Sequence, residues 1–131
     1  MNEPYRTVLL HHRLPDGSAH YDWLLDRDGR GPLLTFRLDR DISQDAEPFQ
    51  AQPIADHRRL YLDYQGPIAG DRGHVERVAC GRCLVALERA DRLRIWVRLG
   101  RRVGWLGGFR QGPVFLLTLE EKGGREPAGF G

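Results

Sequence analysis

A histidine and an aspartate separated by one residue, in His20-Tyr21-Asp22, are the first side chains in this sequence that could bind a metal. On a β-strand His20 and Asp22 would share a face, with their backbones about 6.6 Å apart, so their side chains could converge on one divalent ion. His11 or His12 could supply a third ligand, and two histidines with one carboxylate suit manganese, iron or zinc. The alternative interpretation is a surface histidine–aspartate pair on an exposed strand.

A second cluster contains His57 and Tyr61, four residues apart. A straight strand would separate these two residues by about 13 Å, with both on the same face. They can contact one phosphate only if the chain bends between them or if His57 lies in the preceding loop. The alternative interpretation is an ordinary edge strand that carries a solvated pair, Arg58 and Arg59.

Length and composition describe the chain that must position these residues. The 131 residues weigh 15.0 kDa, which predicts one domain, and 40% hydrophobic with 29% charged residues is typical of a globular protein. Sixteen glycines and eight prolines argue against a helical bundle. Two cysteines exclude a disulfide scaffold, and no apolar stretch approaches the roughly 20 residues that a membrane helix needs. We expect a cytoplasmic protein with no membrane partner and no secretory signal.

Arginine supplies almost all of the positive charge. The 20 basic residues are one lysine, Lys122, and nineteen arginines, although the net charge is only +2. A guanidinium group matches phosphate oxygens with two parallel donors. Genomic base composition can also favour arginine codons, so this enrichment alone does not indicate a nucleic-acid-binding protein.

Short segments with alternating apolar residues predict strands, most clearly at Arg92–Arg98, where Leu93, Ile95 and Val97 share a face. The other expected strands are residues 5–10, 20–25, 33–38, 59–64, 74–78, 84–88 and 113–119. Turn residues separate them, including Cys80-Gly81, and residues 39–53 are expected to form a surface loop. The pattern predicts an all-β fold: a single domain, residues 1–131, forming a small closed or partly open β-barrel of about eight short strands with few or no helices. Its core should span residues 5–119, with a flexible tail at 123–131.

Two further motifs are interpreted as structural. Cys80 and Cys83 form a single Cys-x-x-Cys with no second pair of ligands, so we expect two ordinary thiols at a hairpin turn. The segment Gly104–Gly108, with Trp105 inside it, should be a hairpin with an aromatic plug, because no helix follows it as a phosphate loop would require.

The two clusters in combination resemble a known family. His20-Tyr21-Asp22 with an upstream histidine, followed by Asp56-His57 and the run Leu62–Ile68, is similar to the 3'-phosphoesterase domain of bacterial DNA ligase D. The resemblance is greatest to short, stand-alone members of the family, and it extends over residues 5–119.

The resemblance implies a compact β-barrel and a manganese-dependent removal of a terminal ribonucleoside and then of the 3'-phosphate. The metal ligands of the family correspond here to His12, His20 and Asp22, with manganese or another divalent metal such as zinc. The residues that contact the scissile phosphate correspond to His57 and Tyr61. His12 is preferred to His11 because stand-alone members place their histidine just before a turn like the one that follows here.

One departure concerns the phosphate site. Leu24 stands where the family has an arginine two residues after the metal-binding aspartate. Replacement cations could come from Arg13, Arg37, Arg40 or Arg59, and we assign phosphate binding to Arg40 and Arg59.

Three functions follow from these observations. The first is a metal-dependent phosphoesterase acting on DNA or RNA-tipped DNA 3' ends, beside a separate DNA ligase or end-joining factor. The second is a catalytically weakened module that binds nucleic-acid ends or phosphate, which Leu24 favours. The third is a structural barrel with a vestigial metal site. In each case we expect a monomer or a simple dimer.

Overall fold

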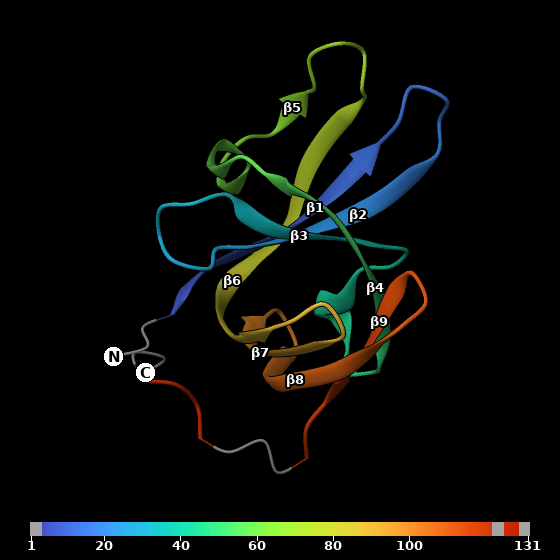
Figure 1. Cartoon of the computed structure of the whole chain (residues 1–131). Coiled ribbons are helices and arrows are strands. Elements are labelled where there is room, and N and C mark those ends of the chain that lie inside the picture. The colour runs from blue at the N-terminus through green and yellow to red at the C-terminus, as the bar shows by residue number, and fades with distance from the viewer. Residues whose placement is uncertain (1–3, 122–124, 129–131) are drawn as a thin grey trace.

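The computed structural model describes residues 4–121 and 125–128, and these contain nine β-strands and two short 3-10 helices (Figure 1). The elements are β1 (Tyr5–Arg13), β2 (Ala19–Leu25), β3 (Leu33–Leu38), η1 (Ile42–Gln44), β4 (Phe49–His57), η2 (Arg59–Leu62), β5 (Gly66–Pro67), β6 (His74–Glu88), β7 (Arg92–Leu99), β8 (Arg102–Gln111) and β9 (Val114–Leu119). Within the described part of the chain, no helix is long and apolar enough to cross a membrane.

Eight of the strands close into an antiparallel β-barrel. They follow the order β1-β2-β3-β4-β9-β8-β7-β6, and a further pairing of β6 with β1 closes the ring. β5 is an additional short strand on β6, outside the ring. The predicted all-β barrel of about eight strands is confirmed.

β6 is long because it belongs to two parts of the molecule (Figure 1). Its first half pairs with β1 and β5. We call this region, at the top of Figure 1, the upper lobe. Its second half pairs with β7 in the barrel. The expected division into strands 74–78 and 84–88, with a hairpin turn at Cys80-Gly81, is therefore wrong. A Cβ atom on Gly81 would lie 1.8 Å from the carbonyl oxygen of Arg98, so this glycine allows two strands to approach closely and does not form a turn.

Three other expected elements differ from the structure. The hairpin expected at Gly104–Gly108 lies inside β8, where a Cβ atom on Gly108 would lie 1.9 Å from the carbonyl oxygen of Leu116. The loop expected at 39–53 contains η1 and the first half of β4. The strand expected at 59–64 is η2, because the backbone N–H groups of Asp63 and Tyr64 both bond to the carbonyl of Leu60. The expected tail at 123–131 lies mostly outside the described residues.

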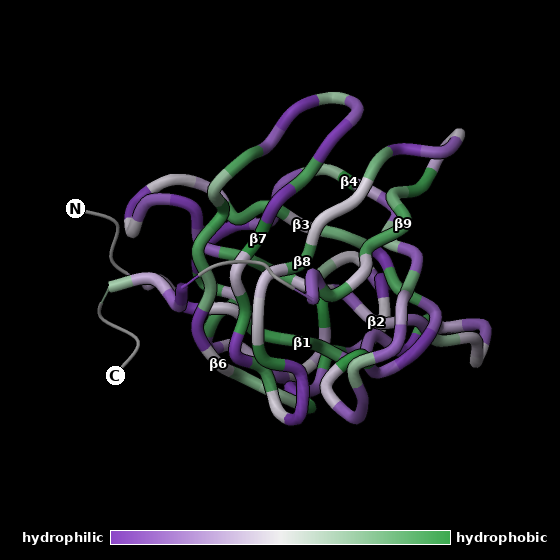
Figure 2. The backbone as a smooth tube through the Cα atoms, turned by 90° about the horizontal axis from the view of Figure 1, so that it is seen from below, coloured by the Kyte–Doolittle hydropathy of each residue, from purple (hydrophilic) through white to green (hydrophobic). Residues whose placement is uncertain are grey.

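The sheet formed by β1–β3 is buried on both faces. Its inner face contributes Leu9, Trp23, Leu25 and Phe36 to the core of the barrel. Its outer face contributes to a second apolar cluster, which η2 covers: Val8, Leu10, Leu24, Leu33, Leu62 and Val75. Figure 2 shows hydrophobic segments on these strands and hydrophilic loops around the barrel. The outer cluster forms the floor on which the candidate site is built.

Candidate metal centre

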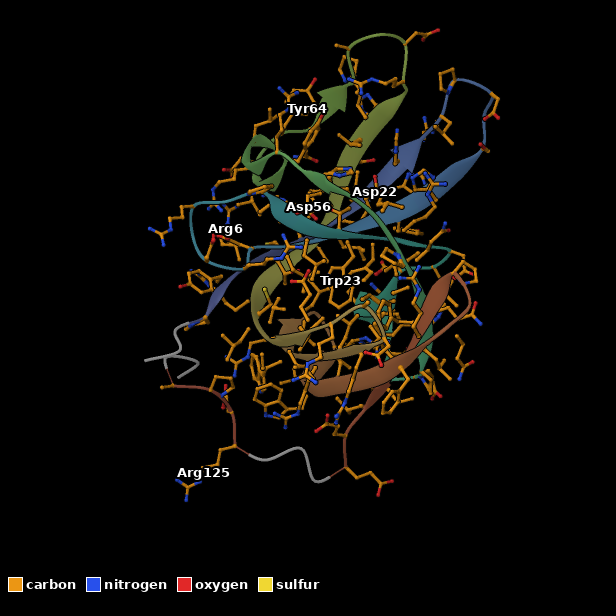
Figure 3. All side chains as sticks on the ribbon, in the orientation of Figure 1. Arg6, Asp22, Trp23, Asp56, Tyr64 and Arg125 are labelled. Atoms are coloured by element: carbon orange, nitrogen blue, oxygen red, sulfur yellow. The ribbon has the colours of Figure 1, made fainter. Side chains whose placement is uncertain are left out.

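The pairing of β1 with β2 brings together the histidines and the aspartate that the sequence singled out. Its register sets His12 opposite His20 and Leu10 opposite Asp22. All four side chains lie on the outer face of the sheet, because neighbouring positions on that face belong to the outer cluster. In Figure 3, Asp22 lies on the side of the upper lobe, whereas Trp23, the next residue, lies inside the barrel.

His11 lies on the opposite face of β1. It pairs with Tyr21 in the register, and the two rings pack edge to face with centroids 5.1 Å apart. His12, and not His11, therefore accompanies His20 and Asp22.

The three side chains converge on a small volume. Their candidate ligand atoms all lie within 4.8 Å of one another. His12 Nδ1 is 3.3 Å from one oxygen of Asp22, and His20 Nε2 is 3.0 Å from the other. Asp22 is only 2% exposed, so the alternative of a surface histidine–aspartate pair is wrong.

Among the described residues, two buried atoms of this group have no hydrogen-bond partner: His12 Nδ1 and Asp22 Oδ1. His12 Nε2 lies 2.8 Å from the carbonyl oxygen of Arg72, which can only accept, so Nε2 donates; in the neutral ring the lone pair is then on Nδ1. His20 Nε2 lies 3.0 Å from Asp22 Oδ1. Metal-binding histidines commonly use one ring nitrogen for a backbone carbonyl and the other for the ion. This donor set could hold a divalent cation.

The charge state of His20 suits metal binding. Burial lowers the pKa of His20, and the positive charge of Arg37 lowers it further, whereas Asp22 acts in the opposite direction. A lowered pKa keeps the imidazole neutral, which is the form that binds a metal.

A bend in the chain brings His57 and Tyr61 together. β4 ends at His57 and η2 begins at Arg59, so the two rings pack with centroids 5.6 Å apart. The chain bends between them, as contact with a single phosphate would require. The backbone N–H of His57 donates to the Thr35 hydroxyl at 3.2 Å. His57 Nδ1 lies 3.0 Å from the carbonyl oxygen of Ala55 and therefore donates to it, which leaves Nε2 facing Asp22 at 3.9 Å.

Both clusters line one pocket with a volume of about 340 Å³. Three arginines also line it, Arg37 from β3, Arg58 before η2 and Arg72 from the turn before β6. Arg37 pairs directly with Asp22 in the β2–β3 register. The site thus combines a potential cation site, a histidine–tyrosine pair and three arginines in the pocket lining, of which Arg72 donates its Nε–H to the carbonyl of Ala69, and this arrangement suits a phosphate ester.

Arg40 and Arg59, the two expected phosphate-binding residues, do not line this pocket. Arg59 forms a two-pronged ion pair with Asp26 at 2.8 and 2.9 Å. Arg40 pairs with Asp45 at 2.9 Å. Both guanidinium groups stabilise loops, through partners that are not adjacent in sequence.

Of the four replacement cations considered from the sequence, only Arg37 lines the pocket. Arg58 and Arg72 were missed. Arg58 adjoins His57 in the sequence, which is a signal that could have indicated it. The sequence around Arg72 gives no signal for its role, because Arg72 reaches the site only through the long-range pairing of β6 with β1.

Leu24 is fully buried in the outer cluster. Its position is an apolar contact beneath the site, and Arg37 of the neighbouring strand β3 lines the pocket.

The two cysteines are both free thiols. Burial raises the pKa of Cys83 to about 12, so this thiol remains protonated, while Cys80 is exposed. Their expected role as ordinary thiols stays a prediction, although they lie within β6 and not at a turn.

Comparison with protein-family models gives no match, and comparison with curated proteins gives none either. The function must therefore be inferred from the residues of the site.

Proposed function

We propose that this protein is a metal-dependent 3'-phosphoesterase that trims blocked 3' ends of DNA by removing a terminal ribonucleoside and a 3'-phosphate in end repair. The observation that carries the proposal is that the buried His12, His20 and Asp22 lie in the same pocket as His57 and Tyr61. The resemblance of these residues to the ligase D phosphoesterase domain supports the choice of substrate.

His12, His20 and Asp22 would hold manganese, or another divalent ion such as zinc. When bound, such an ion polarises a phosphate oxygen and lowers the pKa of a water molecule. The second nitrogen of His12 is fixed by the carbonyl of Arg72, which orients the ring before any ligand arrives.

His57 and Tyr61 act on the phosphate ester itself. With Nδ1 engaged by Ala55, His57 has Nε2 available in the pocket, where a protonated ring donates to a phosphate oxygen or to the departing oxygen. Tyr61 packs against that ring and orients the phosphate with its hydroxyl. Thr35 holds the backbone of His57 in place through the hydroxyl that accepts its N–H.

Arg37, Arg58 and Arg72 neutralise the negative charge that develops on the phosphate. They supply the positive charge that the family arginine provides and that Leu24 lacks. The substrate is a DNA or RNA-tipped DNA 3' end, and the product is a 3'-hydroxyl that a separate ligase or end-joining factor can use.

The experiment uses two primer–templates, one with a 3'-terminal ribonucleotide and one with a 3'-phosphate, in manganese, magnesium or chelator. We expect manganese-dependent shortening and dephosphorylation by the wild-type protein and none by His20→Ala. His11→Ala is the matched control, since His11 is the neighbouring histidine on the opposite face of β1. Equal activity of His20→Ala and wild type would refute the proposal. Wild-type activity that persists in chelator would refute it as well.

The burial of Leu24 favours a second candidate function, a module that binds 3' ends or phosphate without cleaving them. This function predicts retention of the primer–template in a gel shift with no product in any metal. Its affinity should decrease steeply with salt, by roughly 0.7–0.9 log units per log unit of salt for each phosphate contact.

A further inference from the structure

Arginines and aromatic rings alternate on the outer wall of the barrel formed by β7 and β8. The outward positions of β7 include Arg92, Arg94 and Arg98, and each guanidinium lies over an aromatic ring. The carbon Cζ of Arg92 is 5.3 Å from the ring centroid of Phe109, and that of Arg94 is 3.9 Å from the centroid of Trp105. We define this surface, with Arg82 of β6, as the arginine wall: Arg82, Arg92, Arg94, Trp96, Arg98, Trp105 and Phe109.

Phe109 is the feature of the wall that points most directly to a ligand. Its side chain is 61% exposed, the most exposed of the large apolar residues described. It borders a shallow groove with a volume of about 360 Å³, lined also by Arg92, Gln111 and Thr118. An exposed ring beside a cation and two hydrogen-bonding side chains matches a nucleobase, which offers a flat face to the ring and polar edges to its neighbours.

The charge of the wall favours a polyanion. Its members include four arginines, and among the described residues Glu120 pairs with Arg94 and Glu126 pairs with Arg98. Arg82 and Arg92 are exposed and flank the two ends of the wall. A nucleic-acid strand satisfies both requirements, since its phosphates would contact the exposed arginines and a base would stack on the exposed ring of Phe109.

The wall lies away from the candidate metal centre. In the closed order of the barrel, β8 is four strands from β2 in either direction, so the two surfaces occupy opposite sides. We infer that the arginine wall is a second binding surface for single-stranded nucleic acid, with Phe109 as the stacking platform and Arg92 as a phosphate contact. Binding at this surface requires neither a metal nor the pocket.

The test measures the affinity of a fluorescein-labelled oligothymidylate by anisotropy, in chelator, over a series of salt concentrations. We expect Phe109→Ala to weaken binding at least fivefold, the low end for one base stacked on an aromatic ring. Phe109→Tyr should retain wild-type affinity, because either ring can stack. Arg92→Gln should weaken binding and reduce the salt slope by about 0.7.

Arg30→Gln is the matched control, because Arg30 is an exposed arginine in the β2–β3 loop, outside the wall. The inference is wrong if Phe109→Ala binds as tightly as wild type, or if Arg30→Gln loses as much affinity as Arg92→Gln. Because binding is measured in chelator, it does not depend on the metal centre. A protein without phosphoesterase activity could therefore still show wall binding, and an active enzyme could lack it, so the two proposals fail separately. Circular dichroism of each variant verifies folding.

Discussion

Asp22 and Trp23 are neighbours on β2, yet the two faces of the strand that they occupy satisfy their polar groups differently. On the inner face, Trp23 packs on Phe36 and Phe49 and donates its indole N–H to the Thr7 hydroxyl at 2.9 Å. On the outer face, Asp22 and His12 each retain a buried acceptor that is unpartnered among the described residues. The indole of Trp23 is thus satisfied within the fold, whereas a bound cation could satisfy the two acceptors on the outer face.

The difference has an energetic meaning. A buried polar atom without a partner costs about 1–3 kcal/mol, so a chain selected for stability alone would pair these two acceptors. The apolar cluster beneath them supplies the rigidity that keeps them close together. The barrel core and the candidate metal centre therefore lie on opposite faces of the same strand, β2.

The largest expected effect is on the inner face. Trp23→Ala should lower the free energy of unfolding by about 3–5 kcal/mol, because it removes a fully buried ring and leaves a cavity. Urea unfolding measures the change. Phe109→Ala, an exposed aromatic on the opposite wall, should change the free energy by less than about 0.5 kcal/mol. Equal effects of the two variants would contradict the division between faces.

The next effect is on the outer face and on metal affinity. Asp22→Asn should weaken manganese or zinc binding at least a hundredfold in calorimetric titrations, because an amide supplies no charge to the ion, and the barrel should remain folded. His11→Ala should leave metal affinity unchanged. If Asp22→Asn unfolds the chain, His20→Ala gives the same comparison at a less buried position. Unchanged metal affinity in both Asp22→Asn and His20→Ala would show that the outer face of β2 does not bind the metal.

A third effect concerns Asp26, which directly follows β2 and holds η2 through Arg59. Burial opposes ionisation of Asp26, but hydrogen bonds from Arg59 and from the backbone of Gly29 outweigh it and hold its pKa below the usual range. A lowered folded-state pKa stabilises the protein above the unfolded pKa of about 3.9, and this stability is lost as the pH falls through the folded value.

Asp26→Asn should therefore lower the free energy of unfolding by roughly 1.5–3 kcal/mol at pH 7 and converge with wild type as the pH approaches 2. Urea titrations across this pH range measure the difference. Asp16→Asn, at an exposed turn, serves as the control and should show a smaller change. A constant difference between Asp26→Asn and wild type at all pH values would contradict the assignment.

The smallest expected effect is at the rim of the pocket. Arg37→Gln should raise the KM for the 3'-phosphate substrate about fivefold, since one exposed guanidinium contributes a modest charge-assisted contact. Arg30→Gln, remote from the pocket, should leave KM unchanged. Steady-state kinetics distinguish the two, and an unaltered KM in Arg37→Gln would place the phosphate elsewhere.

The sequence predicted those features of the site that depend on local alternation. The period of two places His20 and Asp22 on one face, and the parity of positions along β1 explains why His12 joins them while His11 does not. The barrel class followed from short alternating segments. Both depend on geometry that repeats along a single strand.

The features that it failed to predict depend on contacts between distant strands. Gly81 and Gly108 suggested turns, but each lies in a strand where a neighbouring backbone leaves no room for a Cβ atom. Arg59 suggested phosphate binding, but Asp26 engages it across a loop. A single sequence gives no signal for which of nineteen arginines will meet a carboxylate and which will meet a pocket.

The pairing of β1 with β6 also determines when the site can form during synthesis. Tyr5 pairs with Cys83, and β4 pairs with β9, so the ring can close only after β9, which ends at Leu119, has left the ribosome. Barrels with such non-local pairings fold in milliseconds to seconds, slower than proteins rich in local contacts. His12, His20 and Asp22, which could hold a metal ion, precede in the sequence the strand β6 that completes their surroundings. In a nascent chain, His12, His20 and Asp22 are therefore exposed to solvent before the pocket around them has formed.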